Sequence, residues 1–423
     1  MFKKNTLSTG FRIIVAPMQG TNTVTILVMC ATGSDYETKP ENGISHFLEH
    51  MFFKGTKNRP SADGIRRELD QMGSISNAFT AHETTGYFIK AGTPYLERSI
   101  EILADIYRNS LLAPPEIEKE KQVVIEEMHM RRDDPATRIW DLWDTYLYGD
   151  QPAGWDIAGK EETVRSLSQE DLVRYFEHQY VAENTAVIVA GNIDEAKVTE
   201  LVTSLFSDIR HSEPRTHVDV HEEQNEARLH LEKKQTDQTH LIIGFRGYPV
   251  FRPERYAADL LATVLGGSWS SRMFSKIREE LGLAYTVYAA SENYSNRGYL
   301  LTYAGVAHEN VEKTVEAVLD EYRRIREDPV PADELLRTKD FIKGRMLMSL
   351  ETSNAVASFV GSEEMLTGIP LTIDEVFAKL DLVTASEVQA VASELFRPNR
   401  LNIAALGTDP DRARLEELLF RFR

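Results

Sequence analysis

The sequence predicts an α+β protein made of two homologous domains, each a mostly antiparallel β-sheet packed with helices. Three observations predict this class. Strand-like and helix-like patterns are mixed along the chain. Segments of the first half recur in the same order in the second half. A chain of 423 residues is also too long for one ordinary hydrophobic core.

The first half opens with two strand-like runs and continues with alternating helical and strand-like patterns. The predicted strands cover residues 11–16, 24–31, 74–90 and 185–190. The predicted helices cover residues 45–53, 61–72, 95–110, 116–131, 136–148 and 168–179. A polar stretch with few large apolar residues then follows at 211–228, which is typical of a linker.

The second half repeats landmarks of the first at a nearly constant spacing. The segment IRREL at 65–69 recurs as IREEL at 277–281, and Gly55 matches Gly267 at the same offset. Near the ends of the halves, NTAVIVAG at 184–191 resembles NRLNIAALG at 399–407. Repeated order at a fixed period indicates duplication of one domain. We therefore predict domains at residues 1–210 and 229–423, joined by the linker.

Composition limits the class of protein. A net charge of −18 argues against a nucleic-acid partner, because phosphates require a basic surface. The sequence has no run of eighteen apolar residues, so no membrane-spanning helix is predicted. The basic N-terminus is not followed by an apolar segment of the kind found in signal peptides. A single cysteine, Cys30, allows no intrachain disulfide, and we predict a cytoplasmic location.

The stretch GISHFLEHMFF at 43–53 combines an apolar helical pattern with His46, Glu49 and His50. Histidines four residues apart lie on one face of a helix and can bind the same ion, with Glu49 beside them. H-x-x-E-H is the inverted form of the zinc-peptidase motif H-E-x-x-H. The alternative is a core helix with hydrogen-bonded histidines. At an offset of 212 the second half has the apolar YAADLLATVLGG, so the scaffold does not require these polar residues.

A catalytic zinc needs a third protein ligand and an open position for water. The predicted helix at 116–131 contains Glu120 and Glu127, which are two helical turns apart on an otherwise apolar stripe. Glu126 points about a third of a turn away and is the competing candidate. In the second half Leu336 and Lys343 correspond to the two glutamates, so these carboxylates disappear together with the histidines.

These motifs resemble the pitrilysin or insulinase family of inverted zinc peptidases. The resemblance rests on HFLEH followed by Glu127, on GSISNAFTAHETTGYF at 73–88, and on GGSWSSRMFSKIREELGLAY at 266–285. Further matches cover nearly the whole chain. Within the family, the chain looks most like the small bacterial relatives of mitochondrial processing peptidase.

The resemblance implies a role for each candidate residue in a zinc metalloendopeptidase. His46, His50 and Glu127 would bind one Zn²⁺ per chain, and Glu49 would be the general base. Glu120 would orient a ligand, although it is also consistent with a charge near a helix N-terminus. The first domain would be catalytic, and the second would lack the metal site and complete an enclosed substrate chamber. The expected substrates are peptides or unfolded, presequence-like segments.

The resemblance also implies how a peptide is held. Asn77, Ala78 and Phe79 would lie in an edge strand that pairs with an extended substrate, although an ordinary sheet strand has the same pattern. Arg278 and Tyr285 would reach the substrate from the second domain and stabilise the developing oxyanion. For Arg278 a structural role is the alternative, because Arg66 occupies the matching place in the first half.

Small two-domain members of the family commonly pair, so the resemblance implies a homodimer, and a requirement for a second, different subunit is left open. The alternative function is a non-catalytic partner or scaffold subunit, a class that the same family contains. Such subunits typically lose motif residues, whereas this chain keeps all of them. A purely structural metal protein would not need Glu49 as a base.

Overall fold

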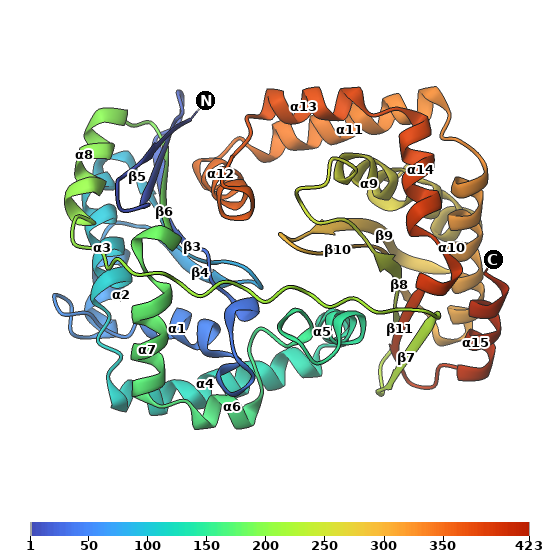
Figure 1. The fold of residues 1–423 in the computed structure, drawn as a ribbon, viewed down its shortest axis with the longest axis horizontal. Helices are drawn as coiled ribbons and strands as arrows, with labels where there is room; N and C mark the ends of the chain where they lie inside the picture. Colours follow the sequence, from blue (N-terminus) through green and yellow to red (C-terminus); the bar gives the residue numbers. More distant parts are fainter. Residues whose placement is uncertain (1, 423) are drawn as a thin grey trace. The chain divides into compact units, whose positions relative to one another are not determined.

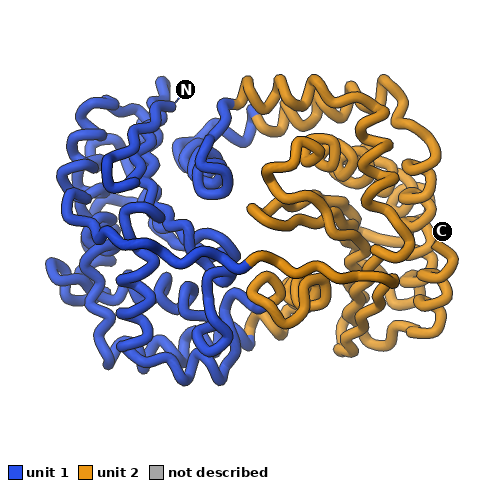
Figure 2. The backbone as a smooth tube through the Cα atoms, viewed as in Figure 1, with its two compact units in different colours: residues 1–129, 155–218, 347–372 blue, residues 130–154, 219–346, 373–423 orange. Residues whose placement is uncertain are grey.

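The computed structural model describes residues 2–422, which form two compact units (Figure 2). Of the described residues, unit 1 contains those within 1–129, 155–218 and 347–372, and unit 2 contains those within 130–154, 219–346 and 373–423. Each unit contains one β-sheet and the helices that cover it (Figure 1). The units are therefore not simple consecutive halves of the chain.

The sheet of unit 1 has six strands, and its only parallel pair among the described strands is β2 with β6. Its order is β1 (Lys3–Thr6), β2 (Arg12–Pro17), β6 (Thr185–Gly191), β3 (Thr23–Cys30), β5 (Thr85–Gly92) and β4 (Ile75–Thr80). The central strands β3 and β6 are buried along almost their whole length, because both faces of the sheet are covered. The short strand β4 is at one edge.

The sheet of unit 2 repeats this arrangement with five strands. Its order is β7 (Arg228–Lys233), β11 (Asn402–Gly407), β8 (Thr239–Arg246), β10 (Gly298–Val306) and β9 (Ala284–Asn293). Again one pair, β7 with β11, is parallel and the other pairs are antiparallel. Because the strand order and directions match β2-β6-β3-β5-β4, the α+β class with two homologous domains is confirmed.

The six helices predicted in the first half are present with similar bounds. Unit 1 contains α1 (Ile44–Phe52), α2 (Ala62–Gln71), α3 (Leu96–Asn109), α6 (Glu161–Ser166), α7 (Gln169–Gln179), α8 (Glu195–Leu205) and α12 (Ser353–Thr367). Unit 2 contains α5 (Pro135–Tyr148), α9 (Arg255–Ala262), α10 (Val311–Glu327), α13 (Ile373–Leu382), α14 (Ala385–Leu395) and α15 (Arg412–Arg421). The long helices α4 (Pro114–Asp133) and α11 (Ala332–Ser349) pass from one unit into the other.

Short helical turns connect these elements. The 3₁₀ turns are η1 (Ser34–Tyr36), η2 (Lys39–Glu41), η3 (Thr93–Tyr95), η4 (Pro152–Gly154), η5 (Ala182–Asn184), η8 (His308–Asn310) and η9 (Pro398–Arg400). Unit 2 also has two π-helical segments, η6 (Thr263–Gly267) and η7 (Phe274–Glu280). Residues 209–227 contain neither helix nor strand, and they include most of the predicted linker.

Each sheet is covered on one face by helices of its own half and on the other face by a helix from the other half. In unit 1, α12 packs on β3 and β6, where Gly361 lies so close that a Cβ would be 2.6 Å from the sulfur of Met29. In unit 2, α5 packs on β11 and β8 through buried residues that include Trp143. Helices α5 and α12 therefore belong to the compact unit of the other sequence half, and the homologous domains at 1–210 and 229–423 stay a prediction.

Candidate active site

Helix α1 has its N-terminus anchored by a buried carboxylate. The backbone N–H groups of Gly43 and Ser45 donate to Glu37 at 2.7 and 2.9 Å, which satisfies two of the donors that a helix start leaves open. Burial raises the pKa of Glu37 to about 7, although these hydrogen bonds act in the opposite direction. Gly43 has φ 98°, and a Cβ there would lie 2.5 Å from the carbonyl oxygen of Ala158. Glu37 and the backbone at Ala158 therefore both hold the N-terminus of α1 in place.

His46, His50 and Glu127 meet between α1 and α4. The Nε2 atoms of His46 and His50 lie 3.7 and 3.3 Å from the two carboxylate oxygens of Glu127. The imidazole rings are 4.7 Å apart between centroids. Within residues 2–422, this is the one group of three histidine, cysteine or acidic side chains with ligand atoms all within 4.8 Å of one another.

Glu120 holds His50 from the other side of its ring. Nδ1 of His50 is 2.9 Å from one oxygen of Glu120, and Nζ of Lys54 is 2.6 Å from the other. Burial acts to lower the pKa of His50, but hydrogen bonds to Glu120 and Glu127 outweigh it and raise the pKa to about 9. When Nδ1 donates to Glu120, Nε2 carries no proton and its lone pair can bind a metal ion. Metal-binding histidines usually have this arrangement.

The inward stripe of α4 is narrower than the sequence predicts. Glu120 and Val124 are buried and Glu127 is half-buried, whereas Val123 and Glu126 are exposed. Of Val123 and Val124, only Val124 therefore belongs to the apolar stripe that faces inward. Glu127 is the carboxylate that faces the histidines, and the competing Glu126 points to solvent.

Glu49 is half-buried on α1 and accepts a hydrogen bond from Oγ1 of Thr80 at 2.6 Å. Burial raises the pKa of Glu49, and the Thr80 hydrogen bond partly opposes this shift. A carboxylate with a raised pKa and a fixed orientation is suited to accept and return a proton.

The donor set fits zinc. Two neutral imidazole nitrogens and one carboxylate oxygen are the ligands typical of a catalytic zinc site, which keeps a further position open for water or substrate. The cluster offers these three side chains, His46, His50 and Glu127, within the span of one ion.

Asn77, Ala78 and Phe79 lie in β4 as the sequence predicts, at the edge of the sheet. They pair with Phe88, Tyr87 and Gly86 of β5, and no described strand pairs with the other edge of β4. The backbone N–H of Ala78 donates to the side-chain oxygen of Asn77 at 2.9 Å. The ring of Phe79 covers Gly86, where a Cβ would lie 2.3 Å from that ring. These features give β4 an accessible edge of the kind that binds extended peptides.

Arg278 and Tyr285 belong to unit 2, whereas the other candidate site residues belong to unit 1. The guanidinium of Arg278 lies 4.6 Å from the ring centre of Tyr285 and 4.8 Å from that of Phe274, so the three side chains form a cation–π stack. Tyr285 is 80% exposed at the start of β9.

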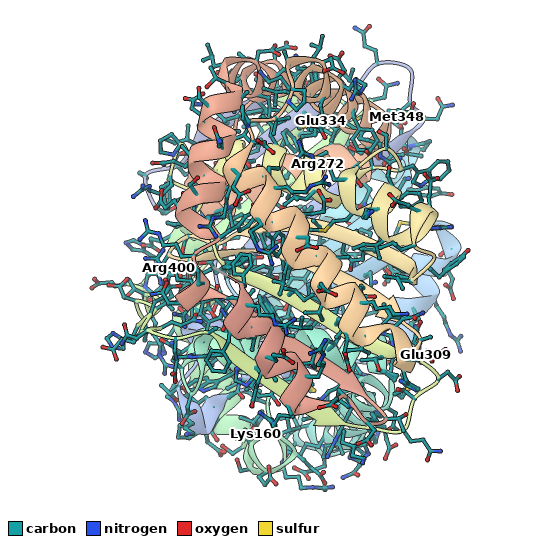
Figure 3. All side chains as sticks on the ribbon, turned by 90° about the vertical axis from the view of Figure 1, so that its right-hand side faces the viewer. Lys160, Arg272, Glu309, Glu334, Met348 and Arg400 are labelled. Carbon is teal, nitrogen blue, oxygen red and sulfur yellow. The ribbon has the colours of Figure 1, made fainter. Side chains whose placement is uncertain are left out.

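The segment that carries Arg278 is the π-helix η7, a geometry that is rare and occurs frequently at functional sites. Just before it, Arg272 makes two hydrogen bonds of 3.0 and 2.7 Å to Glu334 at the start of α11. Figure 3 shows these two side chains close together on unit 2. The ion pair attaches the beginning of this segment to a neighbouring helix.

The structure adds site residues that the sequence patterns do not identify. Glu37, Lys54 and Thr80 contact the motif helix or its partners through side-chain geometry that no short spacing encodes. Thr80 adjoins the predicted edge-strand residues, which is the one signal that places it near the site.

Comparisons with known proteins identify relatives of this chain. A family model described as Insulinase (Peptidase family M16) matches residues 12–160, and one described as Peptidase M16 inactive domain matches residues 166–341. A Bacillus subtilis (strain 168) protein named uncharacterized zinc protease YmxG is 35% identical over 396 residues, which cover 94% of this chain and 96% of the relative. The chain belongs to the M16 peptidase family. The family resemblance predicted from the sequence is thus confirmed.

Solved structures of similar fold include proteins of different roles. A protease from Helicobacter pylori has a TM-score of 0.88 at 23% identity, covering 96% of this M16 family chain and 99% of its own. A chain of complex III2 from Candida albicans has a TM-score of 0.84 at 18% identity, covering 99% of both chains. At these identities the likeness establishes the fold alone. No helix among the described residues has the length and apolar character needed to cross a membrane.

Proposed function

We propose that this M16 family member is a zinc-dependent endopeptidase that hydrolyses peptides or unfolded, presequence-like segments. The observation that carries the proposal is the convergence of His46, His50 and Glu127, with Glu49 one residue from a proposed ligand. Relatives named as zinc proteases support the same chemistry.

In the proposed mechanism, His46, His50 and Glu127 would hold one zinc ion, and Glu120 would orient His50 by accepting a hydrogen bond from its Nδ1. Zinc bound there would lower the pKa of a water molecule and polarise the scissile carbonyl. Glu49 takes the proton from the attacking water and passes it to the leaving amine. The five polar side chains thus divide into three ligands, one orienting carboxylate and one base.

The substrate would lie along the free edge of β4, where main-chain hydrogen bonds hold an extended peptide regardless of most of its side chains. We further propose that Tyr285 donates to the developing oxyanion and Arg278 to the peptide carbonyls. Their stacking on each other supports a joint role, and their assignment to the substrate rests on the family resemblance.

The experiment that tests the function is the Glu49→Gln variant. We expect purified wild-type protein to bind about one zinc per chain and to cleave a quenched fluorescent peptide library. Glu49→Gln should keep the zinc and lose about 10²- to 10⁴-fold in cleavage rate, because the base is gone while the ligands remain. Glu162→Gln, on an exposed side chain of unit 1, is the matched control and should cleave normally.

The alternative function is a non-catalytic partner or scaffold subunit. One observation favours it: a chain of complex III2 shares this fold. Wild-type protein that binds zinc but leaves the whole library uncut, even when a second subunit is supplied, would support this alternative. The homodimer and the cytoplasmic location stay predictions, and sedimentation and cell fractionation test them.

A further inference from the structure

A short side-chain hydrogen bond at the site joins the proposed base to the proposed substrate strand. Oγ1 of Thr80 donates to Oε2 of Glu49 at 2.6 Å. The acceptor is ionisable, and hydrogen bonds to a carboxylate are shorter and roughly twice as strong as those between neutral groups. Thr80 is the last residue of β4, so the bond connects two different elements of unit 1.

The position of Thr80 follows from the strand itself. Along β4, Ile75, Asn77 and Phe79 are exposed, whereas Ser76, Ala78 and Thr80 on the opposite face are half-buried. Ala78 on this face packs against the core cluster to which α1 contributes. The β-branched side chain of Thr80 has few rotamers, so its hydroxyl has a well-defined direction.

We propose that Thr80 is a positioning residue, which orients Glu49 and transmits the pairing of an extended peptide on β4 to this base. The proposal rests on the proposed function, because it assigns a role to Glu49 in peptide hydrolysis. With Oε2 held by Thr80, Oε1 is the oxygen that exchanges the proton. A peptide that pairs with β4 restricts the motion of this strand. Through Thr80, the strand then restricts the motion of Glu49.

The chain offers a simple contrast for testing this role. Thr80→Val keeps the shape of the side chain but removes the hydroxyl, and Thr80→Ser keeps the hydroxyl. Thr6→Val is the matched control, because Thr6 is an exposed threonine that ends β1 at the opposite edge of the same sheet. Loss of a single orienting contact at an active site can cost about 10²-fold in rate.

We expect Thr80→Val to lower kcat about 10- to 100-fold, with KM changed less than about 2-fold and with zinc content and Tm retained. Thr80→Ser and Thr6→Val should cleave within about 3-fold of wild type. Wild-type kcat in Thr80→Val, or an equal loss in Thr80→Ser, would overturn the positioning role.

A second readout does not depend on cleavage. Crystal structures of the zinc-loaded wild type and Thr80→Val should show Glu49 held by Thr80 in the first and in a different rotamer in the second. An unchanged Glu49 in Thr80→Val would overturn the inference even if no peptide were cleaved. If Glu49 moves while the wild type cleaves nothing, Thr80 orients Glu49 and the proposed peptidase function is the part that fails.

Discussion

Helices α1 and α9 are the same element in two copies of one domain, and the three polar motif residues of α1 have apolar counterparts in α9. Each follows the central strand of its sheet, β3 in unit 1 and β8 in unit 2. His46, Glu49 and His50 of α1 correspond to three fully apolar and buried residues of α9, namely Ala258, Leu261 and Ala262. The comparison teaches that the fold needs an apolar helix here and that the polar residues serve another purpose.

The helices that would supply the carboxylates differ in the same way. Glu120 is buried in α4, whereas its counterpart Leu336 in α11 is 59% exposed. The counterpart of Glu127 is Lys343, which pairs with Asp381 of α13. Unit 2 therefore lacks the whole donor set, and three predictions test whether that difference is functional.

The largest effect is expected for the third metal ligand. Glu127→Gln should weaken zinc binding by more than about 10³-fold, because the variant loses the charged ligand of a three-ligand site. Isothermal titration with zinc measures the change. Glu126→Gln is the matched control on the exposed side of α4 and should change the affinity less than about 2-fold. If Glu126→Gln weakened zinc binding more than Glu127→Gln, the ligand would be Glu126 and the assignment of Glu127 would be wrong.

The sequence predicts the local part of this site well, because the relevant spacings lie within single helices. The helix predicted at 45–53 is α1 at Ile44–Phe52, and the alternation of residues 74–90 becomes the β4–β5 hairpin. His46 and His50 meet because a helix brings positions four apart to one face. The duplication is also visible in the sequence, and the matching strand orders of the two sheets agree with it.

Contacts between distant segments could not be predicted in this way. The segment at 355–361 is apolar and helix-like in sequence, but nothing in it indicates that, as part of α12, it covers the sheet of unit 1. Glu364 of the same helix is completely buried and forms ion pairs with Lys4 and Arg12. Likewise, the π-helical turn that carries Arg278 has an ordinary amphipathic sequence. These features depend on tertiary packing, which no periodicity encodes.

An intermediate effect, on stability, is expected when Glu49 of α1 and its counterpart Leu261 of α9 are each replaced by the other residue. Leu261→Glu should lower the free energy of unfolding by more than about 3 kcal/mol, because it buries an unpaired carboxyl group in a packed core. Glu49→Leu should leave stability within about 1 kcal/mol of wild type or raise it, since functional polar groups often cost stability. Chemical denaturation of the zinc-free proteins measures both.

A harmless Leu261→Glu would weaken the comparison, because α9 would then accept a carboxylate as readily as α1. A Glu49→Leu variant that unfolds easily would instead give Glu49 a structural role. Either result would mean that the differences between α1 and α9 do not identify the functional residues.

The smallest effect concerns the residues behind the proposed ligands. Glu120→Gln should weaken zinc binding about 10- to 100-fold, because His50 loses the charged acceptor that orients its ring. Lys54→Met keeps most of the aliphatic stem but removes the charge on the other oxygen of Glu120. It should cost less than Glu120→Gln, since the bond from His50 to Glu120 remains. Competition with a fluorescent zinc chelator resolves these differences.

The zinc affinities of Glu120→Gln, Lys54→Met and the double variant distinguish two explanations for the role of Glu120. If Glu120 acts by orienting His50, the double variant should be no weaker than Glu120→Gln alone, because Lys54 then works only through Glu120. If Glu120 acts as a remote negative charge, Lys54→Met should strengthen zinc binding by removing a nearby positive charge. The 2.9 Å contact between Nδ1 of His50 and Glu120 favours the first outcome. Unit 2 offers no such pair, since Ala262 and Leu336 replace His50 and Glu120.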